Sequence, residues 1–139
     1  MEILEKTHIM SLATKDEGGL WVSDLVFIFD DDLNIYWMSD PDARHSQAIL
    51  KNSEVAGTIT FSTKSKEPNL GIQFFGRANK IDGPRYDLAT KHLKKRGHSE
   101  PKEGDDVLQG DSWYMLKPSK IHLIDEELWG YDKKSFILK

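Results

Sequence analysis

The sequence contains no cysteine, which excludes disulfide bonds, thiolate metal sites and a cysteine nucleophile. It also has no apolar run near the roughly 20 residues that a membrane-spanning helix needs, so no membrane partner is expected. Basic charge is not in excess, because 19 Lys and Arg stand against 23 Asp and Glu. The net charge of −4 argues against a general nucleic-acid binder. No secretory or transit segment is recognisable at the start, and we expect a cytoplasmic protein.

The 139 residues suit one domain, residues 1–139, that can bury a core. Runs of β-branched and aromatic residues separated by Gly- and Asp-rich turns predict strands. These strands are expected at 9–14, 20–29, 35–38, 55–62 and 70–81, with one or two over 112–125 and a last one at 136–138. Helices are expected at 1–8, from Asp40 to near Asn52, and over 85–96, and the polar segment 98–106 is expected to be a surface loop. Mostly β structure with short inserted helices predicts a small antiparallel barrel.

The segment 20–29 is apolar on both faces of a strand. Leu25, Phe27 and Phe29 alternate with Val26 and Ile28. An antiparallel strand of a monomer usually keeps one polar face toward water. Since the expected helices are few and short, a partner subunit is the predicted cover for the second face, and a homodimer is expected.

Two basic residues, Arg44 and His45, stand side by side near the start of the second expected helix, with Asp40 as the expected N-cap and Pro41 at the first helical position. Free N–H groups and a partial positive charge make a helix N-terminus an anion site. Together with the Ser39 hydroxyl, the two side chains would form a phosphate cradle. The alternative is a solvated first turn in which Arg44 pairs with Asp40 or Asp42.

Other chemistry has weaker support in the sequence. Trp129 near the C-terminus could stack on a planar cofactor or pack in the barrel. The basic run 91–98 is typical of a solvated helix face. The five histidines have no metal-ligand spacing, so no metal site is predicted. The serines lack a nucleophile elbow, and no catalytic residue is assigned.

The motifs together resemble the flavin-binding split-barrel family, which includes pyridoxamine 5′-phosphate oxidase-like proteins. Ala13, Thr14, Asp16 and Gly19 match an "AT-D--G" opening, and 43–45 fall where the family has Ser-Arg-Lys. The segment 71–81 falls on a later strand with a "V-x-G-x-A" pattern. The similarity is greatest to a small, poorly characterised bacterial branch. It implies a six-stranded antiparallel split barrel with short helices, which dimerises and binds FMN between its subunits.

The resemblance also implies roles for individual residues. Arg44, His45 and Ser39 would hold the flavin phosphate. Strand positions of the family imply that the backbone at Leu25, Val26 and Met38 faces the flavin ring. Gln73 lies on the strand that supplies amide contacts, and Trp129 lies in the terminus that closes over the cofactor.

The sequence departs from the oxidases at positions that hold cofactor and substrate. Asp24 and Phe29 stand where these enzymes have an arginine and a lysine. The C-terminal Arg-x-His pair that grips their substrate has no counterpart in 126–136. Oxidation of pyridoxamine phosphate is therefore not expected.

Three functions stay open at the level of sequence. The first is an FMN-dependent oxidoreductase that takes electrons from a reduced nicotinamide or another donor and acts on a small molecule. In such an enzyme the cofactor supplies the chemistry and the protein supplies binding and orientation. The second is a non-catalytic cofactor-binding module. The third is use of a deazaflavin or haem in the same cleft.

Overall fold

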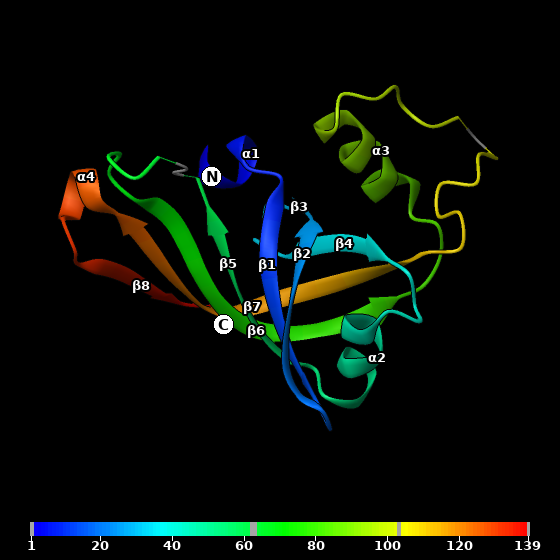
Figure 1. Cartoon of the computed structure of the whole chain (residues 1–139). Helices are drawn as coiled ribbons and strands as arrows, with labels where there is room; N and C mark the ends of the chain where they lie inside the picture. Colours follow the sequence, from blue (N-terminus) through cyan, green and yellow to red (C-terminus); the bar gives the residue numbers. More distant parts are fainter. Residues whose placement is uncertain (1, 62–63, 103, 139) are drawn as a thin grey trace.

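The computed structural model describes residues 2–61, 64–102 and 104–138, which form a mainly β fold with four short helices (Figure 1). The strands are β1 (Ile9–Asp16), β2 (Gly19–Val26), β3 (Ile28–Phe29), β4 (Ile35–Ser39), β5 (Glu54–Thr60), β6 (Leu70–Ile81), β7 (Ser112–Asp125) and β8 (Lys133–Ile137). The helices are α1 (Glu2–Lys6), α2 (Arg44–Lys51), α3 (Tyr86–Lys95) and α4 (Glu126–Trp129). The predicted fold class, mainly β with short helices, is confirmed.

The strands form one antiparallel sheet that curls into a half-barrel, in the order β2-β1-β5-β6-β7-β4-β3 (Figure 1). β8 adds to this sheet by pairing with β7 along Lys120–Ile124. The described residues thus contain eight strands, whereas the family resemblance implied six. The segment 20–29 forms two strands rather than one, and the last strand, expected at 136–138, extends over 133–137.

The break within 20–29 is a change of partner. Residues up to Val26 pair with β1, whereas Ile28 and Phe29 pair with β4 on the far side of the sheet. Between them, the Phe27 N–H donates to the His8 carbonyl oxygen at 3.1 Å. The chain therefore crosses from one edge of the half-barrel to the other at this residue, which sequence periodicity alone did not indicate.

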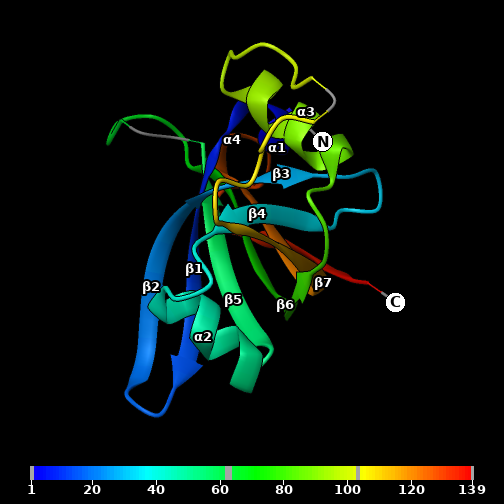
Figure 2. The ribbon, with the colours of Figure 1, turned by 90° about the vertical axis from the view of Figure 1, so that its right-hand side faces the viewer.

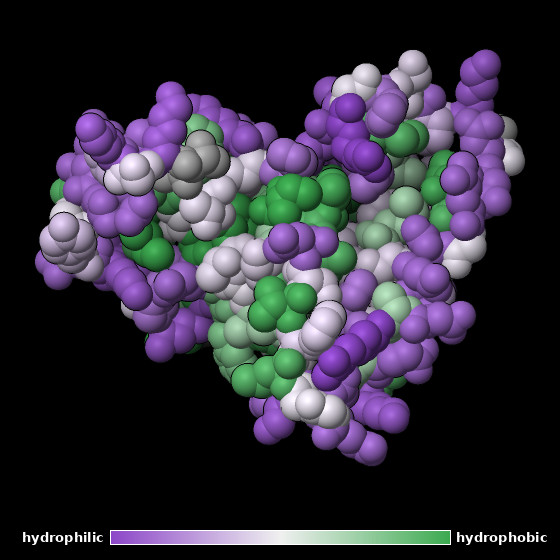
Figure 3. Space-filling view, in the orientation of Figure 1, coloured by the Kyte–Doolittle hydropathy of each residue, from purple (hydrophilic) through white to green (hydrophobic). Residues whose placement is uncertain are grey.

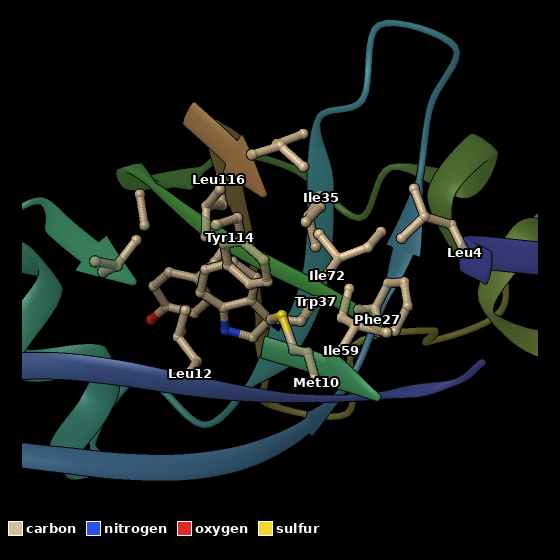
Figure 4. Close-up of a cluster of buried hydrophobic side chains, with 14 of the residues drawn as sticks. Leu4, Met10, Leu12, Phe27, Ile35, Trp37, Ile59, Ile72, Tyr114 and Leu116 are labelled. Carbon is tan, nitrogen blue, oxygen red and sulfur yellow. The ribbon is translucent and has the colours of Figure 1, made fainter. Parts of the chain in front are cut away.

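The core fills the inside of the half-barrel (Figure 4). Trp37 of β4 and Tyr114 of β7 stack with ring centroids 5.7 Å apart. Other buried members come from several strands and include Met10, Leu12, Phe27, Ile59, Ile72, Phe74 and Leu116. α2 packs against β1 and β6, so its first turn is held beside the barrel.

A second apolar cluster lies under α3. It shows that part of the 20–29 segment is covered by the same chain, whereas a partner subunit was the expected cover. Ile28 is buried against Leu88, Ala89 and Trp113, so a helix of the same chain covers it and no partner is needed there. Lys95 fixes α3 in place, since its Nζ donates to the carbonyl oxygens of Leu4 at 3.2 Å and Phe27 at 3.0 Å. Burial lowers the pKa of Lys95 to about 8.

The opposite, outer face of the sheet does carry exposed apolar side chains. Val22, Phe75 and Ile137 are 61%, 44% and 80% exposed. Their strand pairings place them in one row that also contains Ala13, Ala56 and Lys120. Figure 3 shows hydrophobic residues gathered over the β1–β2 hairpin on this side. We call this row the outer apolar row.

Candidate functional site

Two strand edges without strand partners approach each other beside α2. β2 pairs with β1 on one side only. β4 pairs with β7 over its whole length, but with β3 only at Ile35 and Tyr36. Residues 23–26 and 37–39 therefore keep one edge each with no strand partner in the described part of the chain. We call the place where these edges come together the strand split; Figure 2 shows β2 and β4 running in different directions, with α2 beside β2.

His45 spans the strand split. Its Nδ1 lies 3.3 Å from Ser23 Oγ on β2, and its Nε2 lies 2.9 Å from Ser39 Oγ on β4. Ser39 is buried and the imidazole is half-buried. Burial lowers the pKa of His45 below its ordinary 6.5, so the ring is neutral at pH 7. One ring nitrogen then carries a hydrogen and can donate a hydrogen bond, and the other can accept one.

The Arg44 side chain is directed toward the β1–β2 hairpin. Its Nε and Nη2 donate to Asp16 Oδ2 and Oδ1 at 2.9 and 3.1 Å. The guanidinium carbon also lies 4.5 Å from the centroid of the Trp21 ring. The predicted alternative partners, Asp40 and Asp42, are therefore wrong. The hydrogen bond from Arg44 holds the pKa of Asp16 below its ordinary 3.8.

α2 begins later than expected, and its N-cap is Ala43 rather than Asp40. Asp40 instead accepts the Asp42 N–H at 2.9 Å in a turn before the helix. An alanine side chain has no acceptor, so the N-cap residue gives the first-turn N–H groups no side-chain cap. These donors, the partial positive charge of the helix end and the Ser46 hydroxyl, which is buried without a partner, lie beside Arg44 and His45.

A surface groove runs between α2 and the β1–β2 hairpin. Its volume is about 470 Å³, and its lining includes Asp16, Gly18, Arg44, Gln47 and Lys51. Arg44 and Lys51 lie on one face of α2, whereas the acidic groups come from the hairpin. Because Arg44 is the first residue of α2, it belongs both to this groove and to the start of the helix.

The structure brings six of the eight predicted site residues together. Leu25 and Val26 lie on the β2 edge of the strand split, and Met38 and Ser39 lie on the β4 edge. Arg44 and His45 open α2 beside them.

Gln73 and Trp129 lie elsewhere. Gln73 is on the outer face of β6, in register with His122, and accepts from Lys133 Nζ at 3.3 Å. Trp129 ends α4 and lies 5.7 Å from Lys134 Nζ. These two residues do not border the strand split of the same chain.

Sequence reasoning missed the residues that support the cluster. Ser23, Asp16 and Trp21 each contact a predicted site residue. Asp16 was visible in the "AT-D--G" motif, but its link to Arg44, 28 positions away, depends on how α2 packs against the hairpin. Ser23 carried no signal of its own.

Within the described ranges, no three His, Asp or Glu side chains are grouped so that they could hold a metal ion. No helix of the described residues is long and apolar enough to cross a membrane.

Comparison with known proteins places this fold. The chain is 28% identical over 137 residues to the UPF0306 protein YhbP of Escherichia coli O157:H7, covering 98% of this chain and 88% of that protein. Its structure resembles that of a candidate pyridoxamine 5′-phosphate oxidase from Listeria innocua, with a TM-score of 0.67 and 15% identity, over 88% of this chain and 92% of the other. A haem-binding protein from Mycobacterium smegmatis matches with a TM-score of 0.70 and 15% identity, over 99% of this chain and 58% of the other. No family model matches the sequence.

The fold is therefore that of the pyridoxamine 5′-phosphate oxidase-like split barrels. One of these structural neighbours is a haem-binding protein. The similarity to the UPF0306 protein YhbP agrees with the predicted similarity to a small branch.

Proposed function

We propose that this protein binds FMN at the strand split and acts as a flavin-dependent oxidoreductase. The observation that carries the proposal is the convergence of phosphate donors and open strand edges at one place. Ser39, Arg44 and His45 supply donors at the start of α2, and Leu25 with Met38 borders the split.

The donor set fits a phosphate monoester. The Arg44 guanidinium keeps N–H groups that Asp16 does not use, and its side chain is 40% exposed. The uncapped first turn of α2 offers backbone N–H groups with a favourable dipole. These neighbouring donors can bind one dianion, and charge-assisted hydrogen bonds of this kind are the strong ones.

The strand split fits a flat heterocycle. Backbone N–H and C=O groups at a strand edge need hydrogen-bond partners, and in the described part of the chain those of residues 23–26 and 37–39 that face away from β1 and β7 have no strand partner. A flavin ring has carbonyl and imide groups that can pair with such an edge. Val26 is half-buried at the β2 edge, whereas Leu25 packs against the barrel core and Met38 against the cluster under α3.

A homodimer completes the proposed site. The outer apolar row leaves Val22, Phe75 and Ile137 in water in a single chain, and exposed patches of this kind mark interfaces. Gln73 lies in the neighbouring row of the same face. A second copy docked on this face would bring Gln73 into the interface. Trp129 is then also proposed to contribute to a cofactor site shared between the two chains.

The protein's own groups suit binding and orientation of the cofactor, which itself supplies hydride or electron transfer when bound. The neutral His45 imidazole, held between two hydroxyls, can move a proton at Nδ1 or Nε2. No side chain is assigned to substrate or to the electron donor. A non-catalytic module, or a haem or deazaflavin in place of FMN, is the second candidate, and the haem-binding structural neighbour favours it.

The test is the visible absorption of the freshly purified protein, followed by reconstitution with FMN, a deazaflavin or haem. The proposal predicts a flavin spectrum or saturable uptake of about one FMN per chain, followed by oxidation of NADH or NADPH in a screen of electron donors. A protein that takes up haem and refuses FMN would refute the flavin assignment. Saturable FMN binding with no donor oxidised would leave the binding module as the function.

A further inference from the structure

The guanidinium of Arg44 is held by two residues of the β1–β2 hairpin, Asp16 and Trp21. Asp16 binds its Nε and one N–H of Nη2. The Asp16 carboxylate is itself oriented, because Oδ1 also accepts the Gly18 N–H at 2.8 Å. One face of the guanidinium lies over Trp21, with 4.5 Å between its carbon and the ring centroid.

Gly18 leaves the room that this arrangement needs. A Cβ at this position would lie 3.1 Å from Arg44 Nη2 and 3.2 Å from Asp16 Oδ1. Both contacts are tighter than ordinary van der Waals distances. The lack of a side chain at Gly18 therefore leaves room for Arg44 Nη2 beside the Asp16 carboxylate.

The contacts leave one edge of Arg44 available. A guanidinium has five N–H groups, and Asp16 takes the Nε–H and one N–H of Nη2. The remaining three are both N–H groups of Nη1 and the second of Nη2. One from each nitrogen forms the fork that matches two oxygens of a phosphate, and 40% of the Arg44 side chain is exposed to solvent.

We propose that Asp16 is a positioning residue, which holds Arg44 with this fork directed outward and thereby gives the site its preference for a flavin that carries a terminal phosphate. The inference rests on the proposed FMN site. Asp16 orients Arg44, and it therefore affects binding of the phosphate and not binding of the flavin ring.

The experiment compares Asp16→Asn with Asp42→Asn in the full-length protein. Asp42 is an exposed acidic residue just before α2 that does not pair with Arg44. Each variant loses one negative charge, and the loss of charge alone strengthens anion binding in both. Affinities for FMN and for riboflavin, which lacks the phosphate, are measured by flavin fluorescence, and thermal unfolding checks the fold.

The expected result is FMN binding about five- to tenfold weaker in Asp16→Asn than in Asp42→Asn, the scale of part of one hydrogen bond to a charged group. Riboflavin affinity should be equal in the two variants. The Arg44 Nε–H signal in a ¹H–¹⁵N spectrum should lose its protection only in Asp16→Asn.

Equal FMN affinities in the two variants would overturn the role of Asp16 and leave the FMN site intact. Tighter FMN binding in Asp16→Asn than in Asp42→Asn would overturn it too, because Asp16 would then compete with the phosphate. Wild-type protein that binds neither flavin would refute the proposed function itself, and this inference with it.

Discussion

Replacing Arg44 by methionine should remove most of the phosphate affinity while leaving the fold intact. The side chain is 40% exposed, and its ion pair with Asp16 lies at the surface, where such pairs add little to stability. The fork of Arg44 can give two charge-assisted hydrogen bonds to a bound phosphate. Loss of even one such bond corresponds to FMN binding weaker by on the order of ten- to a hundredfold.

The matched control is Lys51→Met. Lys51 lies in the same groove on the same face of α2, two turns after Arg44, so the variant loses the same charge without touching the fork. Fluorescence titration with FMN should show a large loss for Arg44→Met, a partial loss for Arg44→Lys and a small loss for Lys51→Met. Equal losses for Arg44→Met and Lys51→Met would refute the assignment of Arg44, because only the general charge of the groove would then matter.

Three further predictions concern stability and assembly. Burial lowers the pKa values of His45 and His92, so below about pH 6.5 the unfolded chain binds more protons than the folded chain. The unfolding free energy measured by urea titration should therefore fall from pH 7.5 to pH 5, and a flat profile would contradict this. Gly57→Ala should destabilise by about 1–3 kcal/mol, because the new Cβ would collide with the Phe74 ring and lie 2.6 Å from the Ser11 carbonyl oxygen; unchanged urea midpoints would refute it. Dilution with and without FMN, followed by light scattering, should show a dimer that FMN stabilises, and a monomer with full FMN affinity would exclude the shared site.

Most of the strands could be predicted from sequence because each is a local pattern of β-branched residues ended by a turn. The crossing at Phe27 could not, because it depends on which distant strand each half of 20–29 pairs with. The cover of Ile28 by α3 was missed for the same reason. A strand that is apolar on both faces must be packed against other residues on both, but its sequence does not show which segments those are.

In the candidate site, too, local features could be predicted from the sequence, whereas contacts between distant positions could not. The pair Arg44–His45 and the hydroxyl of Ser39 stood out because their chemistry and their place before a helix are local features. The Arg44–Asp16 pair and the Ser23–His45 contact join positions 28 and 22 residues apart. Only the packing of α2 against β2 and the hairpin brings them together. The N-cap was misassigned because Asp40 closes a turn of its own before the helix.

A crystal structure of the protein with FMN would locate the cofactor. We expect the phosphate within hydrogen-bond distance of Arg44 and of the first-turn N–H groups of α2, with the flavin ring between the β2 and β4 edges. A phosphate bound away from Arg44, or a flavin bound outside the strand split, would contradict this expectation.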